Sequence, residues 1–564
     1  MSHGARKWRF CEHDRVRASG LAERLGIPQM AAHLLLLRGL ETPESADRFL
    51  HPALEHLSDP FLLTDMREAI ARIALARERG EHVLVFGDYD VDGIAGTAIL
   101  VNALRRYGIA RCSYGMPHRL MEGYGLSPDR AQWAKEQGAG LIVTVDNGVA
   151  AHDAVQAAHD LGIDTIVTDH HIIEGALPEA VAVVNPQREP PDHPAAELCG
   201  AGVAFKLAMA LTGQTSDLDL AALGTVADIV PLRGENRVMV ALGLREITRG
   251  RRVGLVALAR QARIDLERAR SENIAYHLAP RLNAGGRIGH AQAGVELLLT
   301  DSTEEANRIA QDLEAANEER RGIEATILKE ATDILGREFR PEQRSIVLAS
   351  PTWHAGVIGI VASRIQSRFY RPVVLIAMDE DGEGRGSARS IDAFDIGRAI
   401  EACGDLLVRY GGHRSAAGLT IRQERLAAFS EAFEAEAAKT IPEGELSPSL
   451  RIDAIASLSE IDPQLVATLE LLQPFGHANP APLFATSNVT PMPNSMREMG
   501  TGHMQCMFKE GPSLLRGIAF QMAERIPELA AASAVDIAYT PQFNTYRGET
   551  TLQLNIKDIR ASLP

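Results

Sequence analysis

Acidic side chains and a pair of histidines recur in four short segments of the N-terminal half of the chain. The segments are GDYDVDG, TVDNG, TDHH and GTVADIVPL, in that order. Carboxylate oxygens with one or two imidazoles suit hard or borderline cations such as Mn²⁺ or Mg²⁺, whereas zinc would favour more nitrogen or sulfur. The predicted metal ligands are Asp88, Asp90, Asp92, Asp146, His170 and Asp228, and His171 lies beside them.

Two such cations about 3.5–4 Å apart are the usual device for phosphodiester cleavage, because one lowers the pKa of a bound water and both stabilise charge on phosphorus. In an extended loop, Asp90 and Asp92 can serve two neighbouring ions. A shared carboxylate is needed to hold cations that close, and Asp146 is the candidate for this bridge. The sequence thus predicts a hydrolase with two Mn²⁺ or Mg²⁺ ions in its active site.

Each segment alone has a simpler explanation. The alternating aspartates resemble a calcium loop, but the acid expected at its twelfth position is missing. Asp146-Asn147-Gly148 is most simply a turn, the TDHH segment a helix cap or loop, and Asp228 a buried hydrogen-bonded acid. The joint occurrence of the four segments, in this order, favours the metal site.

The elements that would position these residues are short β-branched runs spaced by a helical segment. The runs are HVLVFG (82–87), GLIVTV (140–145), DTIVT (164–168) and AVAVV (180–184), and the helix spans about 94–107. Such spacing predicts parallel βαβ units, an α/β fold whose sheet is covered on both faces. Ligands of such sheets bind beyond the carboxyl ends of the strands, which is where the acids lie.

Later residues predict three further parts. Ser302 and Glu305 form a possible capping box for one long helix, and a second α/β unit begins at 345–350. The chain is β-rich near its end, which favours a small β-barrel. The expected domains are a catalytic domain with an N-terminal extension, the connecting helix, the second α/β domain and the barrel, at 1–300, 301–338, 339–445 and 446–564.

Composition limits the class of protein. With 564 residues and 45% hydrophobic content, the chain predicts several globular domains and no membrane span. Five separated cysteines without a CxxC pair fit a reducing cytoplasm. The net charge of −16 argues weakly against nucleic acid, since it averages over patches. Residues 245–270 carry eight arginines against three acids, which is either a solvated helix face or a DNA-facing patch.

The four acidic segments resemble the motifs of the DHH phosphoesterases, a family of two-manganese enzymes. The resemblance implies that the predicted ligands bind the ions and that His171 contacts a substrate phosphate. It leaves the role of Asp88 open. The family's pyrophosphatases have a histidine ligand at the position that Phe86 occupies here, so that ligand does not transfer.

Further segments resemble the RecJ exonucleases within this superfamily. RYGGHRSAAGLT (409–420) is similar to the glycine-rich motif of a DHHA1 domain, where glycines allow close backbone approach and the histidine reaches phosphate. Ser387 and Arg389 in GSARS could grip a 5′ phosphate. PFGHANPAPLF (474–484) also matches, although Ala478 stands where glycine is usual. The predicted substrate contacts are Arg119, Arg281, Asn283, Arg287, Ser387, Arg389, Gly411, Gly412 and His413; for any one arginine, a structural salt bridge is an equal alternative.

The RecJ resemblance implies a 5′→3′ exonuclease that digests single-stranded DNA to 5′-mononucleotides in DNA repair and recombination, with a C-terminal OB fold. It also implies a single-strand-binding protein and a DNA helicase as partners. Two alternatives remain open, a small-substrate phosphoesterase and a non-catalytic binding protein with a decayed DHH domain. The long β-rich C-terminal part counts against the first alternative, and the intact carboxylates count against the second.

Overall fold

A parallel β-sheet forms the centre of the first part of the chain. The computed structural model describes residues 6–117, 125–288, 291–546 and 548–562. The strand order β3-β2-β4-β5-β6 confirms the predicted parallel α/β sheet. Its strands are β2 (His82–Gly87), β3 (Arg111–Gly115), β4 (Ala139–Val145), β5 (Asp164–Thr168) and β6 (Ala182–Val184).

Side-chain alternation explains how helices cover both faces of this sheet. Leu84 and Phe86 of β2 pack in the cluster that contains α6 and α7, whereas Val83 and Val85 pack in the cluster that contains α4, α5 and α8. The covering helices are α4 (Met66–Arg79), α5 (Val91–Tyr107), α6 (Pro128–Glu136), α7 (His152–Asp160) and α8 (Gly200–Thr212). The central strands are therefore buried on both faces, and the strand ends remain for chemistry.

A helical region follows the sheet and leads into the connecting helix α15 (Thr303–Glu338). It comprises α9 (Leu218–Ala227), α10 (Gly234–Thr248), α11 (Val253–Gln261), α12 (Ser271–Asn273), the π-helical turn η5 (Ile274–Leu278), α13 (Ala279–Ile288) and α14 (Gln292–Leu299). Ser302 caps α15 by accepting a hydrogen bond from the Glu305 backbone N–H.

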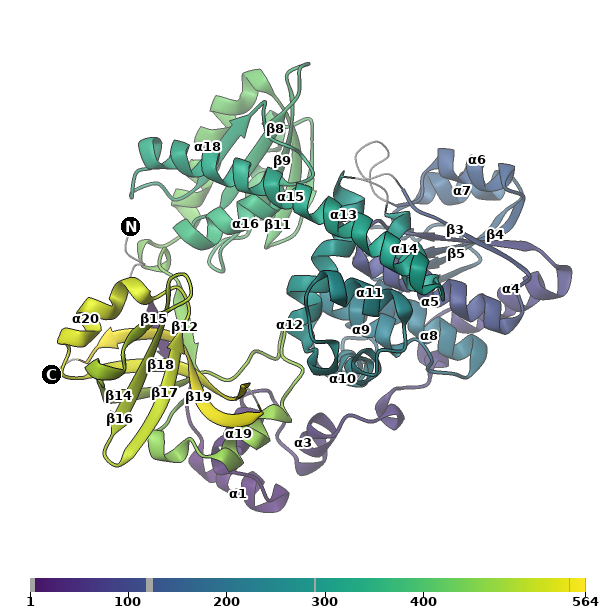
Figure 1. The fold of residues 1–564 in the computed structure, drawn as a ribbon. Helices are drawn as coiled ribbons and strands as arrows, with labels where there is room; N and C mark the ends of the chain where they lie inside the picture. Colours follow the sequence, from purple (N-terminus) through teal and green to yellow (C-terminus); the bar gives the residue numbers. More distant parts are fainter. Residues whose placement is uncertain (1–5, 118–124, 289–290, 547, 563–564) are drawn as a thin grey trace.

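The two halves of α15 belong to different cores. Ile309 and Leu313 pack in the core of the parallel-sheet unit, whereas Ile327 and Leu335 pack against the next α/β unit. Figure 1 shows α15 running from one unit to the other. Because each half is buried in a separate hydrophobic cluster, the helix is a rigid connector rather than a flexible linker.

The second α/β unit has the sheet order β10-β11-β9-β8-β7. Strands β7 and β8 are parallel, and the other pairings of this sheet are antiparallel. Its strands are β7 (Ile346–Ser350), β8 (Val373–Met378), β9 (Glu383–Arg389), β10 (Arg409–Gly412) and β11 (Ala416–Arg422), and its helices are α16 (Ile358–Phe369), α17 (Ile396–Ala402) and α18 (Leu426–Thr440).

The C-terminal unit is a closed β-barrel, as the sequence predicts. Its sheet order is β13-β14-β18-β19-β17-β16-β15, and an additional β14–β16 pairing closes it. The remaining elements of this unit are β12 (Ser449–Ile452), β13 (Ala454–Ile455), α19 (Pro463–Glu470), β14 (Phe484–Pro491), β15 (Arg497–Met499), β16 (His503–Glu510), β17 (Ser513–Ala519), α20 (Ile526–Ala531), β18 (Val535–Tyr546) and β19 (Glu549–Ala561). The aromatic side chain of Tyr539 is fully buried in its core.

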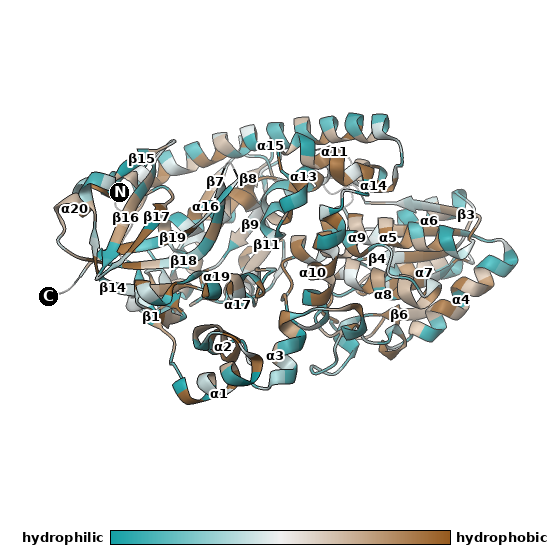
Figure 2. Ribbon diagram, turned by 60° about the horizontal axis from the view of Figure 1, so that its bottom comes forward, coloured by the Kyte–Doolittle hydropathy of each residue, from teal (hydrophilic) through white to brown (hydrophobic). Residues whose placement is uncertain are grey.

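The N-terminal extension packs against this barrel, not against the parallel sheet with which the sequence groups it. Its elements are β1 (Lys7–Phe10), α1 (Arg15–Leu25), α2 (Gln29–Leu36) and α3 (Pro43–Leu50). Strand β1 pairs in parallel with β12, and Leu34 and Leu35 share one core with barrel residues. In Figure 2, brown apolar turns of α2 lie between α1 and α3, beside the barrel. The segment from β1 to α3 thus belongs structurally to the C-terminal unit.

Candidate active site

The predicted metal ligands come together at the carboxyl edge of the parallel sheet. Asp88 follows β2, Asp146 follows β4, and His170 and His171 follow β5, while Asp228 caps the C-terminus of α9. Within each of three groups, the ligand atoms lie within 4.8 Å of one another. The groups are Asp88, Asp90 and Asp146; Asp92, His170 and Asp228; and Asp146, His170 and His171.

Backbone N–H groups fix two of the carboxylates. The Oδ1 atom of Asp90 accepts hydrogen bonds from Asp92 N (3.0 Å) and Gly93 N (3.2 Å), so Asp90 is the N-cap of α5. Asp92 is buried, and its two oxygens accept from Gly200 N (2.6 Å) and Ala201 N (2.9 Å) at the start of α8. These helix N-termini stabilise negative charge, and they point the two side chains in fixed directions.

Asp146 occupies a tight position between α8 and the end of β4. Its backbone is left-handed (φ 61°), a conformation that costs about 1–2 kcal/mol for a residue with a Cβ. A Cβ at Gly200 would lie 2.5 Å from the Cβ of Asp146, so only glycine fits there. Asn147 holds the turn by donating to Phe86 O (3.1 Å) and Val145 O (2.8 Å). The structure thus concentrates strain at the predicted bridging ligand.

His170 lies between three of these carboxylates. Its Nε2 atom is 3.1 Å from Asp146 Oδ1, 3.6 Å from Asp228 Oδ2 and 3.8 Å from Asp92 Oδ2. Burial lowers the pKa of His170 despite these acids. A neutral imidazole surrounded by oxygens is the form in which histidine ligates a metal.

Asp169, which is not among the predicted metal ligands or substrate contacts, organises the two histidines. Its Oδ1 atom accepts from His170 N (2.8 Å), His171 N (3.1 Å) and His171 Nδ1 (2.7 Å). Its Oδ2 atom accepts from Val149 N (2.9 Å). Burial lowers the pKa of His171, but the interaction with Asp169 outweighs it and the net shift is upward. Such a carboxylate–histidine pair fixes the ring and leaves Nε2 for a ligand or substrate.

The remaining acids repel one another. Burial, and then the charge of Asp92, raise the pKa of Asp90 and of Asp228, which reaches about 9. The pKa of Asp146 is also raised, first by burial and then by neighbouring carboxylates. Crowded acids of this kind stay ionised only with compensating positive charge. The oxygen-rich ligand set therefore fits divalent cations of the Mn²⁺ or Mg²⁺ type.

Tight packing surrounds three residues in or next to the first acidic segment, residues 87–93. Phe86 is fully buried among apolar side chains of the sheet, so its position cannot supply a ligand. Asp88 is buried and groups with Asp90 and Asp146. A Cβ at Gly93 would lie 2.4 Å from the Asp88 carbonyl oxygen, which explains the glycine that ends the segment.

Two of the predicted substrate contacts interact with other residues of the protein. Arg281 is buried and pairs with Glu314 of α15, as the salt-bridge alternative expects. Asn283 Oδ1 accepts from Val91 N (3.2 Å) and thereby supports the first turn of α5. Arg119 and the side chain of Arg287 lie outside the described residues.

Half of the arginines in the stretch at residues 245–270 form ion pairs. Four of its arginines have carboxylate partners within 4.0 Å, and two of these pairs reach acids outside the stretch. The pairs are Arg249–Glu246, Arg252–Asp219, Arg268–Asp265 and Arg270–Glu470. Arg252 and Arg270 thus connect the stretch to other elements of the structure.

The other predicted contacts lie in the second α/β unit. Arg389 Nη1 donates to Ser387 Oγ (3.1 Å), and a Cβ at Gly359, in the first turn of α16, would lie 2.8 Å from Ser387 Oγ. Gly411, Gly412 and His413 lie in an exposed hairpin end, where a Cβ at Gly412 would meet the Ala417 backbone at 2.4 Å. Ser387 and Arg389 thus lie directly against Gly359 of α16, because this glycine has no side chain that would separate them from the helix.

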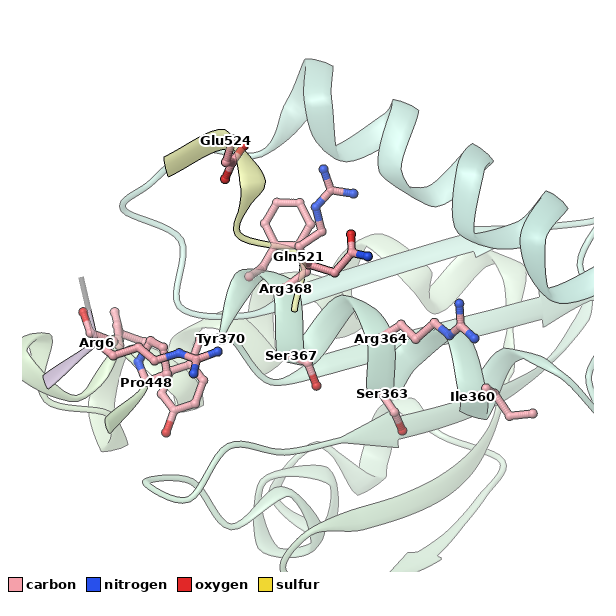
Figure 3. Close-up of a pocket in the computed structure, with 13 residues that line it drawn as sticks. Arg6, Ile360, Ser363, Arg364, Ser367, Arg368, Tyr370, Pro448, Gln521 and Glu524 are labelled. Carbon is pink, nitrogen blue, oxygen red and sulfur yellow. The ribbon is translucent and has the colours of Figure 1, made fainter. Parts of the chain in front are cut away.

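A cavity of about 980 Å³ lies elsewhere, between α16, the barrel and the N-terminal strand. Figure 3 shows Arg364 and Arg368 from α16, Gln521 and Glu524 from the barrel, and Arg6 from the N-terminus around it. None of the predicted metal ligands is among the described residues that line this cavity, so the metal chemistry is separate from it.

Comparisons with known proteins agree with this arrangement. Three family models match, namely the DHH family N-terminal domain at 82–227, the DHHA1 domain at 342–439 and the RecJ OB domain at 452–558. The single-stranded-DNA-specific exonuclease RecJ of Bacillus subtilis (strain 168) is 36% identical over 561 residues, which cover 99% of this chain and 71% of that protein. The RecJ of Escherichia coli (strain K12) is 34% identical, and the match covers 94% of this chain and 96% of that one.

Solved structures give the same result. The crystal structure of RecJ in complex with Mn²⁺ from Thermus thermophilus matches with a TM-score of 0.85 and 31% identity, over 99% of this chain and 80% of that one. Its complex with Mg²⁺ matches with a TM-score of 0.79 and 30% identity, over 99% and 79%. In the described residues, no helix is both long and apolar enough to cross a membrane. The chain belongs to the RecJ family of metal-dependent, single-stranded-DNA-specific exonucleases.

Proposed function

We propose that this chain digests single-stranded DNA from its 5′ end and releases 5′-mononucleotides, with two Mn²⁺ or Mg²⁺ ions in the active site. The observation that carries the two-ion proposal is the double membership of Asp146, which belongs to one ligand group with Asp88 and Asp90 and to another with His170 and His171. A carboxylate common to two groups is what two adjacent cations require.

In this proposal, Asp88 and Asp90 would hold one ion, Asp92, His170 and Asp228 would hold the other, and Asp146 would serve both. The ions would polarise the phosphodiester and lower the pKa of a bound water. His171, whose Nδ1 is fixed by Asp169, presents Nε2 to a phosphate oxygen of the substrate. Asp169 keeps the ring in that orientation.

The second α/β unit would position the 5′ end. Arg389 and Ser387 together offer a guanidinium and a hydroxyl, the donors that suit a terminal phosphate. The glycine at 359 lets the Ser387 and Arg389 side chains lie against the start of α16, where the helix dipole favours an anion. Gly411, Gly412 and His413 would contact the strand from the exposed hairpin end.

In the same proposal, each domain expected from the sequence has its own function. Residues 1–300 would carry the metal site, residues 301–338 the connector, residues 339–445 the 5′-end site, and residues 446–564 an OB barrel that binds the single strand. The packing of α1–α3 against the barrel adds the N-terminal extension to this last part. We also propose a cytoplasmic location, action in DNA repair and recombination, and a single-strand-binding protein and a helicase as partners.

A single assay tests the reaction. The full chain with Mn²⁺ is incubated with 5′-labelled and 3′-labelled single strands, a duplex, a dinucleotide and pyrophosphate. We expect immediate release of labelled mononucleotide from the 5′-labelled strand and gradual shortening of the 3′-labelled one. Preference for pyrophosphate or dinucleotide would favour the small-substrate alternative, and release from the 3′ end first would contradict the proposed direction.

A further inference from the structure

Residues 471–480, which we name the joint segment, lie where the barrel, the metal-binding unit and the N-terminal helices meet. The segment follows α19 and contains most of the sequence PFGHANPAP. It supplies no predicted metal ligand and no predicted DNA contact. It nevertheless makes many hydrogen bonds, and their partners come from residues 34–49, 232–237 and 271.

One buried arginine donates hydrogen bonds to several backbone carbonyls of this segment. Arg237 of α10 is 2% exposed, and its guanidinium donates to Leu472 O (2.9 Å), Leu471 O (2.9 Å) and Gln473 O (2.8 Å). Its Nε donates to Phe49 O (2.9 Å), and its Cζ lies 3.6 Å from the centre of the Phe49 ring. Among the described residues, no carboxylate pairs with Arg237, so carbonyl dipoles and the aromatic ring compensate its charge.

Two further contacts link the joint segment to the metal-binding unit. Leu232 N, on the loop that follows the predicted ligand Asp228, donates to His477 O (2.8 Å). Ser271 Oγ donates to Phe475 O (2.6 Å). A Cβ at Gly476 would lie 2.7 Å from Leu232 Cδ1, so the two stretches of chain are in close contact there. The loop that carries Asp228 is therefore packed directly on the joint segment.

The N-terminal helices complete this arrangement. Arg38, just after α2, donates to Asn479 Oδ1 (2.7 Å) and Pro480 O (2.8 Å). Buried Asn479 in turn donates to Leu472 O and Pro474 O, both at 2.8 Å. The joint segment thus has a rigid internal loop, held by one arginine from each side.

We infer that the joint segment fixes the position of the barrel relative to Asp228, and that Arg237 is a positioning residue for hydrolysis of long strands. The inference rests on the proposed function. A long strand would contact the barrel and the metal site at once, whereas a tetranucleotide would occupy only the metal site and its surroundings. When two binding modules keep a fixed separation, the second contact occurs at high effective concentration. A loosened joint lowers that concentration and weakens only the binding of long strands.

The test measures KM and kcat of the full chain and of Arg237→Gln on a tetranucleotide and on a strand of about 40 nucleotides, which exceeds the site of one OB fold. We expect KM for the long strand to rise about 10-fold or more, while KM for the tetranucleotide and kcat for both substrates change less than about 2-fold. A purely destabilising substitution would instead lower the apparent kcat on both substrates equally, because it removes active protein.

Arg72→Gln is the matched control. Arg72 is also a buried arginine, but its partners Asp164, Glu81 and Gly140 all lie within the parallel-sheet unit. It should lower stability without changing the ratio of the two KM values. If Arg237→Gln does not fold, Ser271→Ala decides the matter, with an expected rise of about 3-fold in KM for the long strand alone.

The outcomes separate the two proposals. If the unsubstituted chain cleaves neither substrate, the proposed function fails, and the inference about the joint fails with it. If the unsubstituted chain cleaves both, and Arg237→Gln or Ser271→Ala changes the two KM values by the same factor, only the inference about the joint is overturned.

Discussion

Buried charge is compensated differently in two regions of this protein, the metal-ligand cluster beyond β4 and β5 and the joint where Arg237 lies. In the cluster, like charges lie against one another, and burial with mutual repulsion raises the pKa of Asp228 to about 9. In the joint, burial and the charge of Arg38 lower the pKa of Arg237 to about 9, but four carbonyl oxygens accept its hydrogen bonds. Backbone carbonyls of the protein thus compensate the charge of Arg237 in the joint, whereas the carboxylates of the cluster require a bound cation.

This difference predicts that a ligand of the cluster can be removed without loss of the fold. Asp146→Asn should lower kcat roughly 10³-fold, because the bridge between the two ions loses its charge. Thermal stability should be unchanged or raised, because repulsion within the cluster decreases. Initial rates on single-stranded DNA, together with thermal unfolding, measure both effects.

The control for this substitution is Asp160→Asn, an exposed acid at the end of α7. It should change neither quantity. Retained activity in the Asp146 variant would refute its bridging role, and a large loss of stability would contradict the contrast between cluster and joint.

The acid behind the histidines should have a smaller effect. Asp169→Asn keeps the shape of the side chain but removes the charge that faces His171 Nδ1. We expect activity to fall about 10- to 100-fold, as is typical of residues that orient metal-site ligands. Steady-state rates at saturating Mn²⁺ test this, and an unchanged rate would show that the pair is not needed for hydrolysis.

Cation binding should distinguish the two regions by stability. Mn²⁺ at about 100 times its dissociation constant should stabilise the full chain by about 2.7 kcal/mol through mass action on the folded state. The shift should be reduced in Asp146→Asn and retained in Arg237→Gln, since only the first changes the cluster. Thermal unfolding with and without Mn²⁺ measures it. An equal shift in both variants would mean that the ion binds elsewhere.

The joint segment also contains the smallest expected effect. Ala478 has a left-handed backbone (φ 58°), which costs about 1–2 kcal/mol for a residue with a Cβ. Glycine at this position would avoid that strain, but it would lower stability by about 0.4–1 kcal/mol because the unfolded chain gains conformational freedom. Ala478→Gly should therefore stabilise the protein by roughly 0.5–1 kcal/mol, with activity unchanged. Denaturant unfolding measures it.

Ala428→Gly, on the exposed face of α18, is the matched control for this last substitution. It should destabilise the protein by about 1 kcal/mol, because glycine in a helix has only the entropic cost. Destabilisation by both substitutions would contradict the strain assigned to Ala478.

The sequence by itself determined the parallel sheet, the connecting helix and the type of metal site. Strands buried on both faces are continuous apolar runs, and the residues that follow β2, β4 and β5 must meet at one edge of the sheet whatever surrounds it. The predicted ligands Asp146 and His170 are 3.1 Å apart for this reason. Local periodicity and chain direction were sufficient, because parallel strands place their ends together.

Only the tertiary structure decided which charged side chains form contacts within the protein. Arg281 has no neighbour in sequence that marks it as structural, and its partner Glu314 comes from α15. The helices α1–α3 carry an ordinary apolar face, and no local pattern indicates that it packs on a barrel at the opposite end of the chain. Arg237 is compensated by carbonyls that every residue possesses, so they leave no signal in the sequence. Hydrophobic faces and backbone acceptors are not specific to one partner, and only the folded chain selects among them.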